Sequence, residues 1–434
     1  MIKKLFAVMG IWGLLCLAAS PVMAGGIINK SNLSADYFRS LTRHASMDAA
    51  DIIAYNPAGV MKMANGFYTK LDVLYIQKDY TNNVPDVSLV PGENGYFKTD
   101  EPSIVPGFFA LYKQEKWAGF FAVTVPGGGG KVEFPSGNAR TSILGLSIIG
   151  GSGGFFNTID SMYLKADSVE LGYTLGGAYA INNMISVAGG LRYIDAEQSF
   201  QGNAVLSGLA PTTKYEVDLE RDATGWGYFL GVNVMPTSKL NFGLLYQSNT
   251  DLDFKSKVTT DTVPIPGGIT GVLNWADGTK QREDLPGLIG VGVGYQFTNK
   301  LRGEVAYTRY LESNAKLEAT RFQDAGDSWE VGVSLTYAFT PQWRASVGYL
   351  HTDIEGMRPE QLLAEAPELD AQTIGVGVVF SPTQQWDISL GYTHVNYDEV
   401  TTDAASALLG RAPAGTVYDK EVRAVSFGVS YRWF

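Results

Sequence analysis

The side chains that most often carry catalysis or hold metals are scarce in this chain of 434 residues. It contains three histidines, His44, His351 and His394, and one cysteine, Cys16. No serine and acidic residue accompany a histidine at a spacing that suggests a nucleophile activated by a general base. Structural and catalytic metal sites need clusters of the same residue types. The sequence therefore predicts no enzyme, no metal site and no cofactor, and a hydrolase is the weaker alternative.

A glycine run is the most unusual local feature. Gly127, Gly128, Gly129 and Gly130 follow Pro126 directly. A phosphate-binding loop is excluded, because the glycine spacing is wrong and the next lysine is followed by valine. Proline cannot donate to a β-ladder and glycine weakens one, so the run predicts a bulge or gap in a strand. An ordinary strand end that leads into a loop is the alternative.

The first 24 residues are typical of a secretory signal peptide. Lys3 and Lys4 precede an apolar run from Leu5 to Ala19, and cleavage is expected after Ala24. An uncleaved anchor is the alternative, although the apolar run is shorter than the roughly 20 residues of a spanning helix. Cys16 lies inside this segment, so the rest of the chain has no thiol, which suits an oxidising compartment.

Composition narrows the class of protein further. The chain has 50 glycines, 23 tyrosines and a formal net charge of −11. A negative balance argues against nucleic acid as a partner, because phosphate binding needs a basic face. After the signal, no segment approaches the length of uninterrupted apolar sequence that a membrane-spanning helix requires.

From about Gly66 onward, apolar side chains recur at every second position. Because successive side chains of a strand point to opposite faces, this period predicts strands with one apolar face and one small or polar face. The clearest segments are Ile289, Val291, Val293, Tyr295 and Phe297, then Trp329, Val331, Val333, Leu335, Tyr337 and Phe339, and then Ile374, Val376, Val378 and Phe380.

Aromatic residues stand at both ends of these apolar faces. Trp329 and Phe339 bound one face, and Trp343 and Tyr349 bound the next. Rings at both edges of an apolar band are typical of a membrane barrel, whose apolar face contacts lipid while the other face lines the lumen. A soluble sandwich or propeller, with the apolar face turned inward, is the alternative.

These segments predict an all-β fold, a fourteen-stranded antiparallel transmembrane barrel over residues 66–434. Six connections are short and seven are long. Short periplasmic turns, long external loops and an even strand number are typical of a multi-pass barrel in the outer membrane of a Gram-negative-type bacterium. Both termini are then periplasmic. Phe434 ends the chain with an aromatic signal for insertion, one position out of phase with the lipid-facing side chains. The predicted strands are 66–80, 103–113, 116–134, 163–180, 184–201, 215–234, 238–260, 279–297, 300–312, 328–339, 342–354, 370–380, 385–398 and 419–434.

Residues 25–65 precede the first strand and have no transmembrane role. Residues 45–54 are compatible with a short helix, which ends at the sequence Asn56, Pro57, Ala58, Gly59. Pro57 restricts Asn56 to an extended conformation, and Gly59 permits a turn. The economical position for such a compact segment is inside the lumen, as a plug, or hatch.

This arrangement resembles the FadL family of outer-membrane transporters for long-chain fatty acids and other hydrophobic compounds. The resemblance implies passive uptake in three steps: capture on external loops, passage into the lumen by a shift of the plug, and sideways release through a kink in the third strand. Uptake of aromatic or alkane hydrocarbons by the same route, or a diffusion porin for polar solutes, are the alternatives. The residues that carry the resemblance are the motif Asn56-Pro57-Ala58-Gly59 directly before the first strand, Lys116 to Gly127, Gly225 to Phe254, and Leu285-Pro286 before Gly290.

Each implied step has candidate residues. Pro126 with the four glycines 127–130 is the candidate for the kink and lateral opening. Arg192 lies nearest the middle of a strand among the lumen-facing charges and could receive a carboxylate, or pair with an acid or hold the plug instead. An apolar loop is the candidate capture groove, because exposed apolar clusters usually mark binding sites, although packing among loops would also explain it. The groove residues are Ile143, Leu144, Leu146, Ile148, Ile149, Phe155 and Phe156.

The partners expected from this reading are a hydrophobic small molecule, outer-membrane lipid with lipopolysaccharide, and the barrel-insertion machinery.

Overall fold

The computed structural model describes residues 28–85, 95–317, 326–402 and 414–434, so the predicted signal peptide, residues 1–24, lies outside the described residues. The strands form one closed antiparallel barrel with fourteen strand positions, as predicted. Each position is called a stave here, because some staves consist of two successive strands. Two short additional strands, β2 (Tyr96–Thr99) and β18 (Val400–Thr401), pair at its edge. The staves are β1 (Gly66–Asn83), β3 (Ser103–Lys113), β4 (Trp117–Gly127) with β5 (Val132–Phe134), β6 (Phe156–Ala180), β7 (Ile185–Gly208), β8 (Thr213–Thr237), β9 (Leu240–Gln247) with β10 (Asp253–Asp261), β11 (Lys280–Arg282) with β12 (Gly287–Gln296), β13 (Leu301–Leu311), β14 (Trp329–Ala338), β15 (Trp343–Asp353), β16 (Ala371–Thr383), β17 (Trp386–Tyr397) and β19 (Val417–Arg432).

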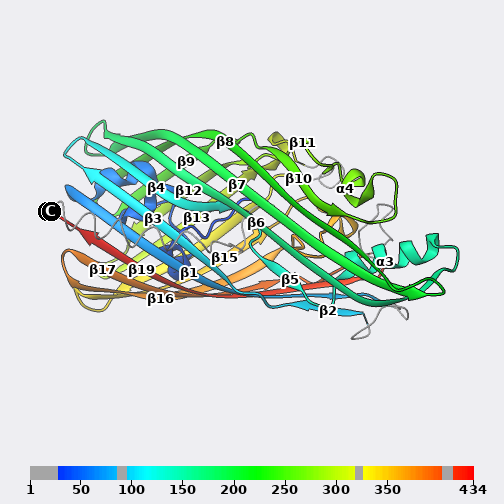
Figure 1. The fold of residues 1–434 in the computed structure, drawn as a ribbon. Coiled ribbons are helices and arrows are strands. Elements are labelled where there is room, and N and C mark those ends of the chain that lie inside the picture. Colours follow the sequence, from blue (N-terminus) through cyan, green and yellow to red (C-terminus); the bar gives the residue numbers. More distant parts are fainter. Residues whose placement is uncertain (1–27, 86–94, 318–325, 403–413) are drawn as a thin grey trace, which may run out of the picture.

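The barrel closes between its first and last staves. β1 pairs with β19 along its length, from Tyr68 opposite Arg432 to Asn83 opposite Val417. Figure 1 shows the tight turns, the start of β1 and the end of β19 at one end, called the turn end here. The long connections lie at the other, the loop end, together with the helices α3 (Ala139–Gly151) and α4 (Gly268–Val272).

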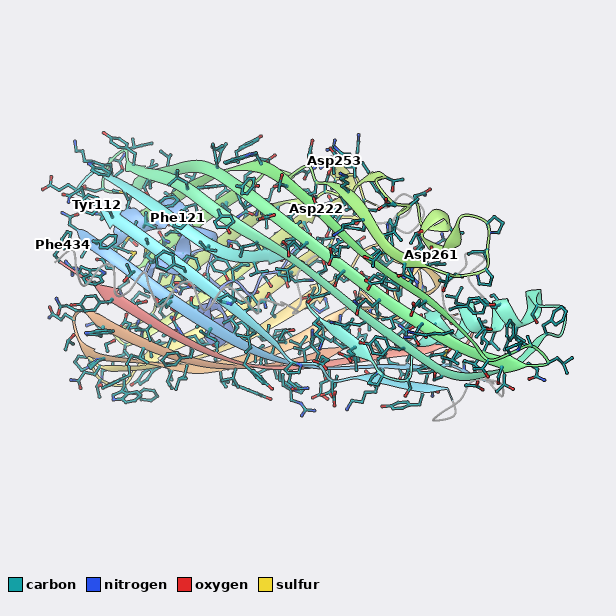
Figure 2. The ribbon with its side chains drawn as sticks, in the orientation of Figure 1. Tyr112, Phe121, Asp222, Asp253, Asp261 and Phe434 are labelled. Atoms are coloured by element: carbon teal, nitrogen blue, oxygen red, sulfur yellow. The ribbon has the colours of Figure 1, made fainter. Side chains whose placement is uncertain are left out.

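The two faces of the wall differ as the alternating pattern predicts. Val333 and Leu335 are exposed on the outer face of β14, whereas Glu330 and Gly332 are buried on its inner face. Figure 2 places the aromatic residues Tyr112 and Phe434 toward the turn end and Asp253 and Asp261 toward the loop end. The outer surface therefore changes along the barrel from an apolar, aromatic band to a charged region.

Several boundaries differ from the prediction. The predicted strand 238–260 is two strands, β9 and β10, and the predicted strand 279–297 is β11 and β12, with isolated bridging between Thr250 and Leu285 at the joint. β6, β7 and β8 extend further toward the loop end than predicted, because they pair with one another beyond the neighbouring staves. The apolar loop after the third strand is partly helical. Asn138 caps α3 by accepting a 3.1 Å hydrogen bond from the Thr141 amide.

The N-terminal segment fills the turn-end half of the lumen. It contains α2 (Ala35–Ser40) and two 3₁₀ helices, η1 (Ala50–Ala54) and η2 (Pro57–Lys62). The predicted helix over 45–54 is therefore shorter than expected, and α2 was not predicted. Phe38, Ile52 and Val60 are fully buried. Within the described parts of the chain, no helix is both long and apolar enough to cross a membrane.

Candidate functional site

Glycines of the barrel make room for the plug. A Cβ atom at Gly243 would lie 1.8 Å from the carbonyl oxygen of His44, and one at Gly348 would lie 2.0 Å from that of Ser40. Gly292, Gly332 and Gly375 face the plug in the same way. The small residues of the lumen-facing parity therefore form a cradle for the plug backbone. The sequence showed these glycines but not what they face.

The motif before the first strand ties the plug together and to the wall. Asn56 is fully buried, and its side chain accepts a hydrogen bond from the Gly59 amide, which caps η2. Its Nδ2 donates to the Ser46 carbonyl and to Asn233 Oδ1, at 3.2 and 2.8 Å. Gly59 is needed for close approach rather than a left-handed turn, because a Cβ there would lie 2.3 Å from Asn56 Nδ2. Pro57 and Ala58 are buried with them.

Buried ion pairs brace the plug. Arg43 forms two hydrogen bonds with the Asp51 carboxylate, at 2.7 and 3.0 Å. Arg39 binds Asp36 and Asp48, at 2.6 and 3.1 Å. Lys70 of β1 joins this group through Asp36, at 3.0 Å.

The pKa values of the brace carboxylates Asp36 and Asp48 depend on the cations beside them. Burial alone would raise the pKa values of Asp36 and Asp48. The nearby cations, Lys70 for Asp36 and Arg43 for Asp48, hold both values below the ordinary range. Asp36 and Asp48 are therefore ionised at neutral pH.

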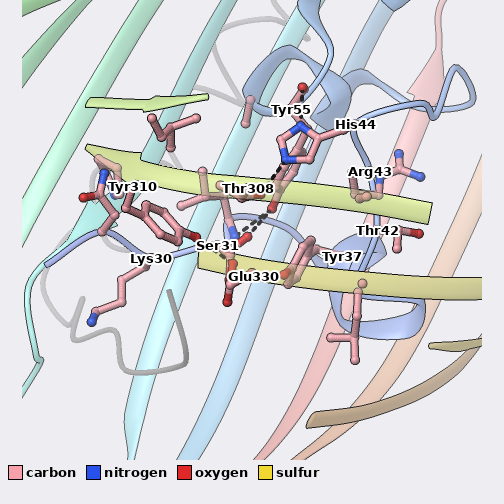
Figure 3. Close-up of a pocket in the computed structure, with 18 of the residues that line it drawn as sticks. Lys30, Ser31, Tyr37, Thr42, Arg43, His44, Tyr55, Thr308, Tyr310 and Glu330 are labelled. Atoms are coloured by element: carbon pink, nitrogen blue, oxygen red, sulfur yellow. Dashed lines mark hydrogen bonds between the residues drawn. The ribbon is translucent and has the colours of Figure 1, made fainter. Parts of the chain in front are cut away.

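His44 is held as a neutral ring between plug and wall. Its Nδ1 lies 2.9 Å from the carbonyl oxygen of Tyr55, which can only accept, so Nδ1 carries the proton. Nε2 then accepts from the Thr308 hydroxyl, at 3.0 Å. Burial lowers the pKa of His44. Figure 3 shows the ring between these two partners.

A luminal cavity of about 540 Å³ lies between this plug and the barrel wall. Tyr37, Tyr55 and Tyr310 line it together with apolar side chains, and Glu330 accepts a 2.6 Å hydrogen bond from the Tyr310 hydroxyl. Arg192 lies at its edge. The lining of the luminal cavity is therefore a mixture of aromatic, apolar and polar side chains from the plug and the wall.

The third stave is broken at the glycine run. β4 pairs with β6 up to Thr124 opposite Gly172, the register shifts, and Gly127 faces Glu170. Within the break, the Gly130 amide donates a 2.9 Å hydrogen bond to the Ser168 carbonyl of β6, and ladder pairing resumes at Val132 in β5. A Cβ at Gly127 would overlap the Glu170 carboxylate, and Gly128 adopts a left-handed conformation with φ +93°. These two glycines are therefore required by the backbone path at the break.

The start of the described chain lies across this break. Asn29 forms an antiparallel bridge with Gly127, and the Lys30 amide donates a 2.8 Å hydrogen bond to the Pro126 carbonyl. Asn29 Nδ2 donates to the Pro286 carbonyl on the opposite side of the lumen, at 2.9 Å. The strap formed by residues 29 and 30 thus supplies pairing that the broken stave lacks.

Beside the break lies a second space of about 420 Å³, the wall cavity. Pro126, Arg192 and Gln247 line both it and the luminal cavity. Arg192 Nη1 donates a 2.6 Å hydrogen bond to Gln247, while the buried Nη2 has no partner among the described residues. Arg192 is therefore placed between the two spaces and keeps one free donor.

The predicted capture groove is only partly assembled as a pocket. An apolar space of about 550 Å³, the outer pocket, lies at the loop end. Of the seven predicted residues, Leu144 and Ile148 line it. Leu146, Ile149 and Phe156 pack partly buried against the core, and Phe155 is 62% exposed at the tip of the loop. Ile143 is half-buried on α3.

The second wall of the outer pocket comes from a loop that sequence reasoning missed. Val263, Ile269 and Leu273, around α4, face α3 across the pocket. Trp275 anchors this loop, with its ring 4.8 Å from the guanidinium carbon of Arg221. In the sequence, the available signal was a set of apolar residues between turn-forming glycines and prolines. It could not show that these residues pack against α3, because that contact joins segments distant in sequence.

Two buried lysines near the loop end were also missed. Lys420 Nζ donates to the Pro367 carbonyl at 2.9 Å and lies 4.9 and 4.2 Å from the ring centres of Tyr80 and Tyr397. Lys78, fully buried, donates to the Lys131 carbonyl. Within the described ranges, neither ammonium group forms an ion pair. The alternating pattern of β1 and β19 indicated that both lysines face the lumen. It could not indicate that they lack an acidic partner among the described residues.

The turn end holds a further space of about 820 Å³ between the plug and the wall. Asp48, Lys62, Asp387 and Arg432 line it with other polar residues. Among the described residues, no group of histidines, cysteines and acids is arranged to hold a metal ion. The spaces of this barrel therefore differ in polarity, from the apolar outer pocket to the charged turn end.

Comparison with known proteins shows that other proteins share this architecture. Solved structures with the same fold include a FadL homologue of Pseudomonas aeruginosa (TM-score 0.70, 16% identity, 94% of this chain and 100% of the other). They also include the toluene transporters TodX of P. putida (0.61, 12%, 90% and 96%) and TbuX of Ralstonia pickettii (0.61, 14%, 92% and 98%). No curated protein matches the chain.

Residues 161–433, more than half of the chain, match the family model described as outer membrane protein transport protein (OMPP1/FadL/TodX). The resemblance drawn from the motif at Asn56 and the third strand is confirmed. The chain belongs to the OMPP1/FadL/TodX family of outer-membrane transport proteins.

Proposed function

We propose that this family member carries long-chain fatty acids passively across the outer membrane, with both termini in the periplasm. The observation that carries the proposal is the pair Lys78 and Lys420. Both ammonium groups are buried in an apolar cluster without a carboxylate partner among the described residues. An isolated buried charge is costly, and a ligand carboxylate would relieve that cost.

The spaces of the barrel define a route for such a ligand. Its hydrocarbon chain enters the outer pocket, where each buried CH2 contributes about 0.8 kcal/mol. The head group then passes the two lysines and reaches the luminal cavity and Arg192. Release follows sideways at the break between Gly127 and Val132, once the strap withdraws.

The charged brace favours a sideways exit over one through the turn end. A hydrocarbon chain moving toward the periplasm would have to displace Arg39, Arg43 and their acids, and then cross a polar space. The break instead opens beside the apolar band, where lipid receives the chain. Outer-membrane lipid and lipopolysaccharide are thus the expected surroundings, and the insertion machinery is expected to recognise the C-terminal aromatic residues.

Neutral hydrocarbons are the second candidate. They are favoured by the apolar lining of the outer pocket, whose one arginine, Arg140, is already paired with Glu365 at 2.6 Å. The toluene transporters share the fold. A porin for polar solutes fits less well, because the plug fills the turn-end half of the lumen.

Uptake by cells that express substituted proteins separates these functions. We expect the double variant Lys78→Met, Lys420→Met to reduce palmitate uptake about tenfold, in line with the loss of a charged hydrogen bond, and to leave toluene uptake unchanged. Lys255→Met, which removes an exposed lysine of β10, serves as the matched control. Equal loss of palmitate and toluene uptake, or no loss of either, would refute the fatty-acid proposal.

A further inference from the structure

Arg140 is the cation among the described residues that line the outer pocket. It lies in the first turn of α3, lines the pocket, and holds its guanidinium carbon 5.5 Å from the ring centre of Phe200. Its side chain is 12% exposed. An arginine at the end of an apolar pocket is suited to bind the carboxylate of an amphiphile.

In this structure the chain's own Glu365 occupies that guanidinium. Its Oε1 lies 2.6 Å from Arg140 Nη1, while the buried Oε2 has no partner among the described residues. Arginine and carboxylate groups bind best through two parallel hydrogen bonds, and only one is made here. The contact is therefore one that a better-oriented carboxylate can replace.

Glu365 belongs to the loop between β15 and β16, residues 354–370, which folds into the barrel mouth. Leu362, Ala364 and Leu369 are buried there in the apolar cluster of the loop end. Besides Glu365, other contacts hold the loop: Asn82 Nδ2 donates to the Ala364 carbonyl at 2.9 Å, and Lys420 donates to that of Pro367. The main-chain amides of Gly326 and Asp398 donate to the carbonyls of Glu355 and Asp370 near its two ends. The Arg140 contact is thus one of several polar attachments of the loop, and Arg140 itself lines the outer pocket.

We propose that Glu365 holds the place of the ligand carboxylate on Arg140, so that an anionic amphiphile in the outer pocket displaces it and loosens the β15–β16 loop. This inference rests on the proposed function and adds its regulation. The displaced carboxylate regains water, and the loop that covers Lys420 is freed at the moment when a head group is present to bind there. A neutral hydrocarbon fills the pocket without this exchange.

Binding to the full-length protein in lipid nanodiscs tests the exchange. The probes are a dansyl-labelled undecanoate and the corresponding alcohol. Glu365→Gln removes the internal competitor, so it should tighten undecanoate binding about tenfold and leave alcohol binding unchanged. Glu365→Asp, which keeps the charge, and Glu355→Gln, an exposed residue of the same loop, should behave like the wild type. Arg140→Met should abolish the preference for the acid.

A second measurement follows the loop directly. Cleavage by the Glu-specific protease Glu-C after Glu355, an exposed residue of the loop, should accelerate in the wild type on addition of dodecanoate but not dodecanol, and should be fast in folded Glu365→Gln without ligand. Heat-dependent migration on gels confirms that each variant is folded. Unchanged or weaker undecanoate binding in Glu365→Gln, or cleavage insensitive to dodecanoate, would overturn the exchange. A wild type that binds acid and alcohol equally would instead contradict the fatty-acid function itself.

Discussion

The main-chain amide of Lys30 donates a 2.8 Å hydrogen bond to the carbonyl oxygen of Pro126, so the start of the described chain lies on the broken stave of the barrel. The neighbouring bridge between Asn29 and Gly127 extends this pairing. A segment that must leave before the break can open is joined to the plug through Tyr55, whose hydroxyl accepts from the Leu33 amide and donates to the Ser31 carbonyl. If the wall opens at the break as proposed, the plug and the break would therefore be linked through Tyr55.

Locking this strap should stop transport. Paired residues of an antiparallel ladder lie about 5.5 Å apart at Cα, within the range of about 4.4 to 6.8 Å that a disulfide accepts. Lys30→Cys with Pro126→Cys should abolish uptake of a fluorescent fatty acid under oxidising conditions, and a reductant should restore it. Val73→Cys with Phe427→Cys, opposite each other on the outer face of β1 and β19, is the control. Undiminished uptake in the oxidised strap variant would show that the strap does not have to move.

Filling the glycine cradle should unseat the plug. Gly243→Ala places a methyl group 1.8 Å from the His44 carbonyl oxygen, and overpacking of this kind costs about 1–3 kcal/mol. We expect a larger ion conductance in planar bilayers, with the barrel still folded. Gly119→Ala is the matched control, because nothing lies within 4 Å of its added Cβ. Similar conductance in both variants would contradict the cradle.

Docking of the plug should weaken in mild acid because of His44. Burial lowers its pKa in the docked state, so a released His44 takes up a proton at higher pH than a docked one. Docking is fully stabilised above about pH 6.5 and is lost as pH falls from there toward the lowered value, at up to about 1.4 kcal/mol per pH unit. Channel conductance measured from pH 7.5 to 5.5 should rise in the wild type and stay flat in His44→Gln.

Asp36 and Asp48 of the brace cannot produce the same window. The pKa values of Asp36 and Asp48 are held low by their arginine and lysine partners, so these groups titrate only at far lower pH. A rise in conductance that persists in His44→Gln would assign the pH dependence to another group.

The motif at Asn56 should matter for passage rather than for insertion. Asn56→Ala removes three hydrogen bonds, to the buried groups of Ser46, Gly59 and Asn233, at a cost of about 1–3 kcal/mol. We expect lower fatty-acid uptake for Asn56→Ala and for Pro57→Ala, with normal amounts of heat-modifiable barrel in the outer membrane. Wild-type uptake by both variants would remove the role of the motif in gating.

Removal of the whole plug gives the complementary result. Deleting residues 25–63 after the signal should leave a folded barrel, because closure depends on β1 and β19, and should raise leakage of small solutes. Leakage can be measured as antibiotic sensitivity or as single-channel conductance. An intact permeability barrier in the deletion variant would mean that the plug does not seal the lumen.

Local pattern alone was sufficient for the architecture of this protein. The period of two, the aromatic ends of each apolar face and the alternation of short and long connections predicted fourteen staves, since each of these features depends only on neighbours along one strand. The break at Pro126 was visible for the same reason. The period could not show that β9 and β10 are separate, because the alternation continues on both sides of the joint.

The candidate site depended on contacts between residues distant in sequence. Nothing local to Gly243 indicates that His44 approaches it, and nothing near Arg140 indicates Glu365, which lies 225 positions away. Arg192 was recognisable as lumen-facing, but its place between two cavities arises from where β7 meets Pro126 and Gln247. The sequence by itself determined the barrel and its plug, because strand periodicity is a local property. Tertiary structure alone decided which charges are paired and which, like Lys78 and Lys420, have no acidic partner within the described ranges, because a charge is neutralised by whatever the fold brings near it.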